Sequence, residues 1–146
     1  MKHEIWLDMD GVLAGLYDVP NWLDRLRAYD PSPYAQAAPL VNMNTLARKL
    51  NKLQRQGYKL GIISWLSKTS TPAYDKAVTA AKLNWLRKHL RSVQWDTIHI
   101  VSYGTNKWET CGSGILFDDE QRNRNAWQGE AFHPDDMMNV LSSLAA

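Results

Sequence analysis

Short apolar runs rich in β-forming residues alternate along the chain with amphipathic segments of helical period. The apolar runs begin at residue 4 and then cover residues 58–64, 95–101, 114–117 and 131–132. Helical patterns cover residues 21–29, 42–56, 73–90 and 134–144, with a helical turn expected at 123–128. Strands that alternate with helices predict a parallel sheet with helices on both faces.

The segment 42–56 carries the clearest helical pattern. Its leucines recur every three or four residues with Lys and Arg between them, and Gly57 follows as a stop signal. The segment 21–29 is shorter, with Asn21 as a candidate N-cap. The string Asp-Pro-Ser-Pro that follows predicts the end of that helix.

The composition is that of an ordinary globular chain of 146 residues with a net charge of +2, which we interpret as one domain spanning residues 1–146. No strong nucleic-acid or membrane field is implied by this charge. The single cysteine, Cys111, excludes an internal disulfide framework and a cysteine-built zinc site, which suits a reducing cytoplasm. We find no apolar signal core and no run long enough to cross a membrane, so a cytoplasmic location and no membrane partner are expected.

Two carboxylates follow the first apolar run. Asp8 and Asp10 stand one residue apart, and Gly11 comes directly after them. Crowded carboxylates repel each other unless a positive body lies between them, and Mg²⁺ is a hard cation that prefers oxygen ligands. The spacing alone is equally compatible with two solvated acids in a turn.

Further polar residues stand where later strands end. Ser64 ends the second predicted strand, Lys107 lies in the loop before an acidic strand, and Asp118 and Asp119 end that strand. Each alone has a plain interpretation as a turn residue, a solvated lysine or a turn cap. Because ligands of parallel sheets bind outside the carboxyl ends of the strands, their joint placement predicts one site.

This set of groups suits phosphoryl transfer, which needs positioning and charge neutralisation above all. A bridging Mg²⁺ removes the repulsion between a carboxylate nucleophile and an anionic phosphate. An ammonium and a hydroxyl can hold the other phosphate oxygens, and a second carboxylate can move the proton. A covalent aspartyl-phosphate divides one hard displacement into two easier ones.

The string from Asp8 to Ala14, Asp-Met-Asp-Gly-Val-Leu-Ala, resembles the first motif of the haloacid dehalogenase-like (HAD) superfamily of aspartate-dependent phosphatases. The later Ser, Lys and paired Asp follow in that superfamily's order. The resemblance implies a Rossmann-like three-layer α/β/α sandwich with a mostly parallel sheet of order 3-2-1-4-5. It also implies a small helical cap insertion, which we place at residues 15–41.

The resemblance assigns roles to the four acids. Asp8 would be the nucleophile and a metal ligand. Asp10 would be the general acid and base, with its backbone carbonyl on the metal. Asp119 would bind Mg²⁺ directly, and Asp118 directly or through water.

Two further residues would bind the transferring phosphate, Ser64 and Lys107. Lys82 is a rival for the role of the lysine. It lies within the long predicted helix, in a modest basic cluster where a solvated position is expected, so we favour Lys107.

A finer resemblance concerns the segments Lys82-x-x-Trp85-Leu86-x-Lys88 and 106–110, which are similar to the 5'(3')-deoxyribonucleotidase branch. It implies a small phosphomonoester substrate, a (deoxy)nucleoside monophosphate. Trp65 and Leu66 depart from that branch, which has small residues and proline after its hydroxyl, and the cap insertion is shorter. A more open site admits the end of a polynucleotide, so a 3'-phosphatase stays an alternative, as does a phosphatase of small sugar phosphates.

Three aromatic residues near the predicted site, Tyr17, Trp22 and Trp65, are candidates for stacking on a base. The alternative is that they pack the small cap against the core. A different class of protein, a receiver domain or a non-catalytic phosphate-binding module, uses similar residues. Catalytic turnover separates the enzyme from both.

Overall fold

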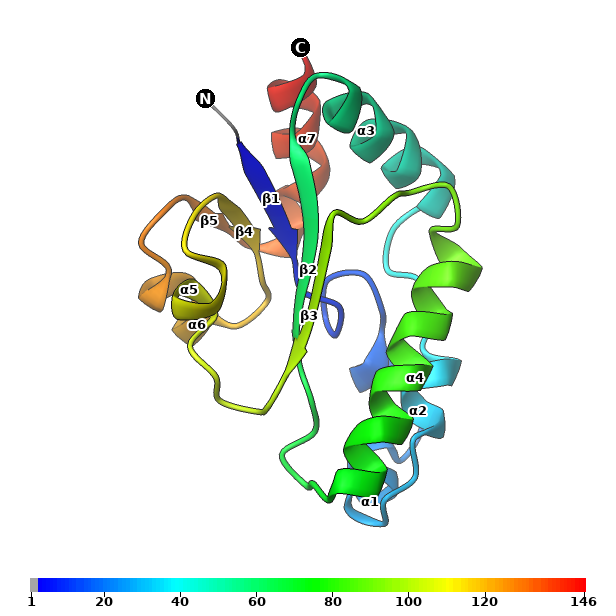
Figure 1. Ribbon diagram of the computed structural model, residues 1–146. Helices are drawn as coiled ribbons and strands as arrows, with labels where there is room; N and C mark the ends of the chain where they lie inside the picture. The colour runs from blue at the N-terminus through cyan, green and yellow to red at the C-terminus, as the bar shows by residue number, and fades with distance from the viewer. Residues whose placement is uncertain (1–2) are drawn as a thin grey trace.

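The computed structural model describes residues 3–146 and contains one five-stranded sheet (Figure 1). The strand order is β3-β2-β1-β4-β5, and all four pairings are parallel. This confirms the predicted sheet and its order. The strands are β1 (Glu4–Leu7), β2 (Lys59–Trp65), β3 (Thr97–Val101), β4 (Ile115–Phe117) and β5 (Ala131–Phe132).

Helices connect the strands and flank them. They are η1 (Leu16–Asp18), α1 (Trp22–Arg27), α2 (Ser32–Gln36), α3 (Met43–Arg55), α4 (Pro72–His89), α5 (Lys107–Cys111), α6 (Gln121–Ala126), η2 (Pro134–Asp136) and α7 (Met137–Ala145). Helices α2 and α5 were not predicted, because they have five residues each and are too short to show a helical period. Where a helix end was expected at 30–33, α2 begins, because proline is tolerated in a first helical turn.

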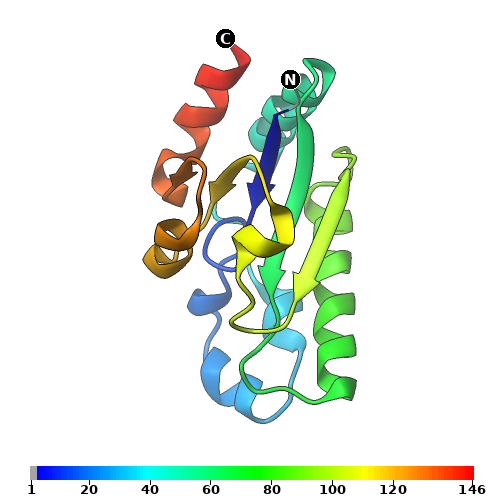
Figure 2. The same ribbon diagram turned by 60° about the vertical axis from the view of Figure 1, so that its left-hand side comes forward.

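Alternate side chains of β1 enter two different cores, which makes the fold a three-layer sandwich. Ile5 and Leu7 pack with buried residues of α3, α4 and α7. Trp6 points to the other face and packs with Trp127, beside Trp108 of α5. Figures 1 and 2 show α5 and α6 on one side of the sheet and α3 and α4 on the other.

The local sequence predicts the ends of α3 better than it predicts the start of α1. Asn42, near which the helix was expected to begin, caps α3, since its side-chain oxygen accepts a hydrogen bond from Thr45 N at 2.9 Å. Gly57 follows with a φ of 103°, a conformation that favours glycine. The expected cap at Asn21 is wrong: this residue has a φ of 58° and its side chain makes no capping bond. The left-handed backbone at Asn21 turns its side chain out of capping position.

The segment 15–41 leaves the sheet after β1 and returns before α3. Its two ends are joined by hydrogen bonds from Gly15 N to Ala38 O (2.8 Å) and from Leu40 N to Leu13 O (2.9 Å). The segment is tied to α4 by the Trp85 indole, which donates to Ala37 O at 2.8 Å. Its helices α1 and α2 therefore lie beside α4, at the end of the molecule to which β1 and β2 point (Figure 1).

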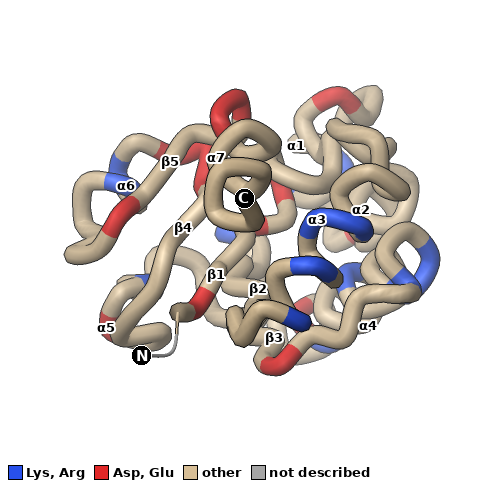
Figure 3. The backbone as a smooth tube through the Cα atoms, turned by 90° about the horizontal axis from the view of Figure 1, so that it is seen from above, with Lys and Arg blue, Asp and Glu red and all other residues tan. Residues whose placement is uncertain are grey.

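Charged residues are spread over the surface, with one row of Lys and Arg along α3 (Figure 3). None of the helices within residues 3–146 combines the length and apolar character that a bilayer crossing requires.

Candidate active site

The first motif folds as a tight turn at the carboxyl end of β1. Asp8 N donates to Phe117 O at 3.0 Å, which keeps the chain paired to β4 up to the first acid. Gly11 has a φ of 80°, and a Cβ there would lie 2.2 Å from the Asp119 carboxylate. A residue without a side chain is therefore required for the acids of β1 and β4 to approach each other.

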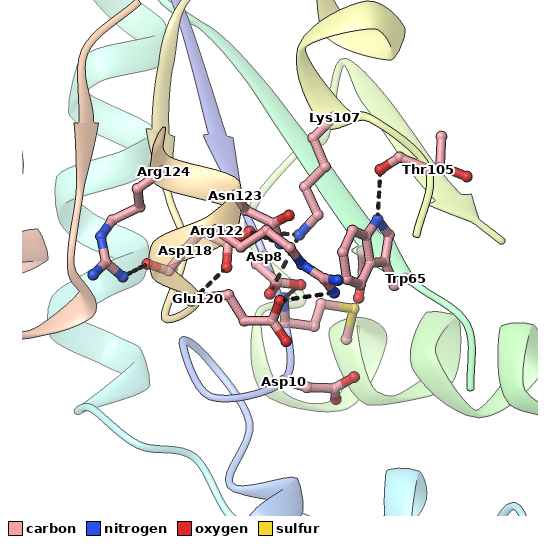
Figure 4. A network of polar contacts seen from close by, with 12 residues as sticks. Asp8, Asp10, Trp65, Thr105, Lys107, Asp118, Glu120, Arg122, Asn123 and Arg124 are labelled. Carbon is pink, nitrogen blue, oxygen red and sulfur yellow. Dashed lines mark hydrogen bonds and ion pairs between the residues drawn. The ribbon is translucent and has the colours of Figure 1, made fainter. Parts of the chain in front are cut away.

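Three acids meet at this point, as the sequence predicted. Asp8, Asp118 and Asp119 each offer an oxygen atom, and these oxygens lie within 4.8 Å of one another. Lys107 Nζ lies 2.6 Å from Asp118 Oδ2 and 3.4 Å from Asp8 Oδ2 (Figure 4). The side chain of Lys107 is 2% exposed, so this charge acts in a medium of low dielectric constant.

Asp118 is fully buried and held by several donors besides Lys107. Its Oδ1 accepts from Glu120 N at 2.9 Å, its Oδ2 accepts from Asn123 Nδ2 at 3.2 Å, and its backbone carbonyl accepts from Arg124 at 2.9 Å. Asn123 and Arg124 were missed by the sequence analysis, because nothing in the short α6 pattern marks them. They fix the turn after β4 and thereby the neighbouring acid.

Asp119 differs from its neighbour. Its Oδ1 is buried and has no hydrogen-bond partner among residues 3–146. Burial raises the pKa of Asp119 to about 7, and the nearby charge of Asp8 adds to this. Burial followed by Asp8 likewise raises the pKa of Asp118 to about 6.

The orphaned oxygen and the donor set fit a hard divalent cation. Carboxylate oxygens without histidine or cysteine are the ligands that Mg²⁺ prefers. A cation beside Asp119 Oδ1 would supply the partner that the protein itself does not. Asp8 and Asp119 are the residues placed to hold it, whereas both oxygens of Asp118 already accept hydrogen bonds from protein donors.

Lys82 has a different environment from the one predicted. Its side chain is 1% exposed, so the expectation of a solvated lysine is wrong. Its Nζ lies 2.8 Å from Asp10 Oδ2, 2.6 Å from Ser64 Oγ and 2.8 Å from Trp65 O. The signal was present in the helix period, since Lys82 occupies the same face as buried Val78 and Trp85.

Ser64 is fully buried at the end of β2 and accepts the hydrogen bond of Lys82. It is not among the residues that line the cleft above the acids, whereas Asp8, Asp10 and Lys107 are. Its contact with a phosphate therefore stays a prediction.

Burial raises the pKa of Asp10 more than the Lys82 ammonium lowers it.

The cleft above the acids has a volume of about 300 Å³. Its walls are largely aromatic and apolar, and all three predicted substrate contacts line it: Tyr17, Trp22 and Trp65. The Tyr17 and Trp22 rings meet edge to face with centroids 4.9 Å apart. Trp22 also packs against the core of the insertion, so this residue both lines the cleft and stabilises the insertion.

Trp65 lines the cleft at the end of β2. Its indole donates to Thr105 O at 2.9 Å, and the Arg122 guanidinium lies 4.8 Å from its ring (Figure 4). The ring is therefore held in place from two sides. Burial and the neighbouring charges of Asp10 and Asp119 raise the pKa of Tyr17 above its usual value, so its hydroxyl stays a hydrogen-bond donor.

Comparison with solved structures identifies the architecture. Over 99% of both chains, the protein superposes on D,D-heptose 1,7-bisphosphate phosphatase from Burkholderia thailandensis with a TM-score of 0.60 and 12% identity. A second match is a putative HAD-like phosphatase from Mesorhizobium loti, with a TM-score of 0.57 and 12% identity over 98% of this chain and 85% of that one. The chain has a HAD-like fold.

A further HAD-like match is D,D-heptose 1,7-bisphosphate phosphatase from B. bronchiseptica in complex with magnesium and phosphate. The TM-score is 0.51 with 14% identity, over 85% of this chain and 74% of that one. No protein-family model matches the sequence, and no curated protein matches it. At these identities the likeness establishes the HAD-like fold, and the chemistry has to be argued from the residues.

Proposed function

We propose that the protein is a Mg²⁺-dependent phosphomonoesterase that acts through an aspartyl-phosphate. The observation that carries this proposal is the cluster of Asp8, Asp118 and Asp119, in which buried Lys107 pairs with Asp8 and Asp118; Asp8, Asp119 and Lys107 line a cleft. A structural neighbour in complex with magnesium and phosphate supports it. The order of the motifs along the chain supports HAD membership as well.

Asp8 is the nucleophile in this proposal. Met9 N donates to its Oδ1 at 2.7 Å, which fixes the carboxylate plane, and its Oδ2 lies toward Lys107. Bound Mg²⁺ would supply positive charge that lets a carboxylate approach an anionic phosphate. Lys107 stays protonated, because Asp8 and Asp118 raise its pKa even though burial alone would lower it. It therefore offers a permanent charge to the transferring group.

Asp10 moves the proton in this proposal. It gives a proton to the leaving oxygen as the phosphorus–oxygen bond breaks. It then takes a proton from the water that hydrolyses the aspartyl-phosphate. Asp10 lines the cleft and has a partly exposed side chain, whereas Asp118 beneath it is fully buried.

The substrate we propose is a (deoxy)nucleoside monophosphate. A flat base can stack between the wall that carries Tyr17 and Trp22 and the wall that carries Trp65. A sugar phosphate would leave much of this apolar surface uncovered. We propose that residues 15–41 act as a small cap, since they supply one of the two walls.

A polynucleotide 3'-end is a second candidate substrate, favoured by two cations at the cleft. Arg27 of α1 and Lys68 of the loop after β2 both line it and are exposed. Within residues 3–146 neither side chain forms an ion pair. They are suited to a second anionic group on the substrate, such as the next phosphodiester.

The test is phosphate release by the purified protein from a panel of substrates, with Mg²⁺ and with EDTA. The panel contains deoxyribonucleoside and ribonucleoside monophosphates, 3'-phosphorylated oligonucleotides, sugar phosphates and p-nitrophenyl phosphate. We expect metal-dependent turnover that is best with nucleotides. Turnover only with sugar phosphates would refute the substrate, and binding of phosphate without any turnover would leave a receiver-like module.

A further inference from the structure

Lys82 is saturated by acceptors that belong to the protein. An ammonium has three hydrogen-bond donors, and Lys82 directs them at Asp10 Oδ2, Ser64 Oγ and Trp65 O, at 2.6–2.8 Å. Its Nζ also lies 5.1 Å from the centroid of the Tyr34 ring. No donor remains for a phosphate, so Lys82 does not fit the role of a second substrate-binding lysine.

The three acceptors come from two different strands. Ser64 and Trp65 end β2, whereas Asp10 lies beyond the end of β1, and Lys82 reaches both from the middle of α4. A buried charge is stable only when it is paired and its hydrogen bonds are satisfied. This arrangement therefore locks the Asp10 side chain to a rigid anchor beneath the cleft.

We propose that Lys82 is a positioning residue that holds Asp10 for proton transfer, and that Ser64 acts through Lys82. This inference rests on the proposed function of the site. Lys82 occupies Oδ2 of Asp10, and none of the hydrogen bonds within residues 3–146 ends on Oδ1. Oδ1 is thus the oxygen that serves the substrate.

Asp10 Oδ1 gives a proton in the first step of the reaction and takes one back in the second. When Asp8 forms its bond to phosphorus, the bond to the leaving oxygen breaks and that oxygen takes a proton from Asp10 Oδ1. When water attacks the aspartyl-phosphate, Asp10 accepts one proton from that water and the Asp8–phosphorus bond breaks. Asp10 ends in its starting state, and Lys82 keeps its own protons throughout.

Without the ammonium, Asp10 loses the contact that sets its side-chain orientation. The carboxyl group can then turn toward Lys107 and the acidic cluster, away from the leaving oxygen. Misplacement of a general acid lowers the rate of proton transfer by a factor of about 100 to 10,000. Substrate binding does not use this contact, so the loss falls on kcat and not on KM.

The experiment compares two leaving groups in the Lys82→Met variant. A nucleoside leaves as an alkoxide and needs the proton, whereas p-nitrophenolate is a stable anion that needs none. Rapid-quench reactions with the enzyme in excess over the substrate give a single burst of nucleoside or p-nitrophenol, whose rate reports the first step alone. We expect the burst rate with a nucleoside monophosphate to fall at least about 100-fold, and the burst rate with p-nitrophenyl phosphate to change less than about fivefold.

The matched control is Lys76→Met, which removes an exposed lysine of the same helix and is expected to change neither burst rate. The rate constant at saturating enzyme does not depend on the fraction of folded sites, so partial unfolding does not alter the comparison of rates. Equal losses with both substrates would overturn the positioning role. Wild-type protein without turnover of either substrate would overturn the proposed function itself, which is a different outcome.

Ser64→Ala provides a milder second variant. If Ser64 acts through Lys82, its removal lowers the nucleotide burst rate severalfold with unchanged KM, and the double variant is no worse than Lys82→Met. A raised KM for both substrates, with effects that multiply in the double variant, would show a direct phosphate contact and overturn this part. If Lys82→Met does not fold, Ser64→Ala decides by the same comparison of leaving groups.

Discussion

The floor and the mouth of the cleft are built in opposite ways. On the floor, the side chains of Lys82, Lys107 and Asp118 are at most 2% exposed, and each is engaged by hydrogen bonds. At the mouth, Tyr17 is 45% exposed and Tyr103 is 44% exposed. The basic groups there, Arg27 and Lys68, are exposed as well.

This difference indicates that the floor determines the type of reaction and that the mouth determines which substrates bind well. Buried charges interact strongly and leave little freedom, so the floor is suited to one type of reaction. The mouth relies on apolar surface and solvated charges, whose contributions are small and depend on the substrate. Changes to Asp8 or Lys107 on the floor should therefore affect kcat for every substrate, whereas the effect of changing Lys82 should depend on the leaving group. Changes at the mouth should affect KM for some substrates.

The largest effect is expected for Asp8→Asn. The amide is nearly the same size but is a poor nucleophile, so turnover should fall by at least about 1,000-fold with all substrates. Phosphate release from p-nitrophenyl phosphate and from a nucleotide measures this. Retention of more than a tenth of the activity would exclude Asp8 as the nucleophile.

Lys107→Met should lower kcat about 100- to 1,000-fold, because a preorganised charge beside the transferring group is lost. Asp8 and Asp118 would then face each other without the intervening ammonium. We expect excess Mg²⁺ to restore part of the thermal stability but little of the activity. Lys88→Met, at an exposed position of α4, is the control.

Trp65→Leu tests whether Trp65 at the mouth of the cleft stacks on a base. Loss of one stacking surface should raise KM for nucleotides about 10- to 100-fold, in line with about 1–3 kcal/mol per stacked base. Ribose 5-phosphate has no base, and its KM should stay within about twofold of the wild-type value. An equal change for both substrates would mean that Trp65 supports the floor and does not contact a base.

Arg27→Gln should have a smaller effect that is confined to substrates with a second phosphate group. We expect KM to rise about three- to tenfold for a 3'-phosphorylated oligonucleotide and to stay unchanged for a mononucleotide. The difference should vanish at high salt, because exposed charges are screened. Arg91→Gln is the control, since Arg91 is exposed and is not among the residues that line the cleft.

The smallest effect is a shift in Tm with pH. The pKa of Asp118 is raised to about 6 and that of Asp119 to about 7, mainly by burial. Unfolding returns both to their lower usual values, so between about pH 5 and pH 8 the folded state binds more protons than the unfolded state. The free energy of unfolding of the metal-free protein therefore decreases as the pH rises.

Mg²⁺ binds the deprotonated carboxylates, so its stabilising effect should be larger at pH 8 than at pH 5. Thermal melts in EDTA and in MgCl₂ at both pH values measure the two effects. Asp119→Asn should remove most of the response to Mg²⁺. A Tm that rises with pH in EDTA would contradict the arrangement of the acids.

The sequence pattern determined the strands and the meeting of Asp8, Asp118 and Asp119, whereas the order of the sheet was implied by the resemblance to the HAD superfamily. The reason is that strand patterns are local, and parallel strands bring their carboxyl ends to one edge. The helix of five residues that presents Lys107 was missed, yet the lysine itself was placed correctly at this edge.

The helix period placed Lys82 on the buried face of α4, but tertiary structure alone decided the hydrogen-bond partners of Lys82 and Ser64. A lysine within a helix is solvated unless acceptors from distant strands surround it, and those acceptors lie 17, 18 and 72 residues away in the chain. The same holds for the orphaned oxygen of Asp119 and for the aromatic walls of the cleft. These features depend on how separate elements pack, which no local pattern of residues encodes.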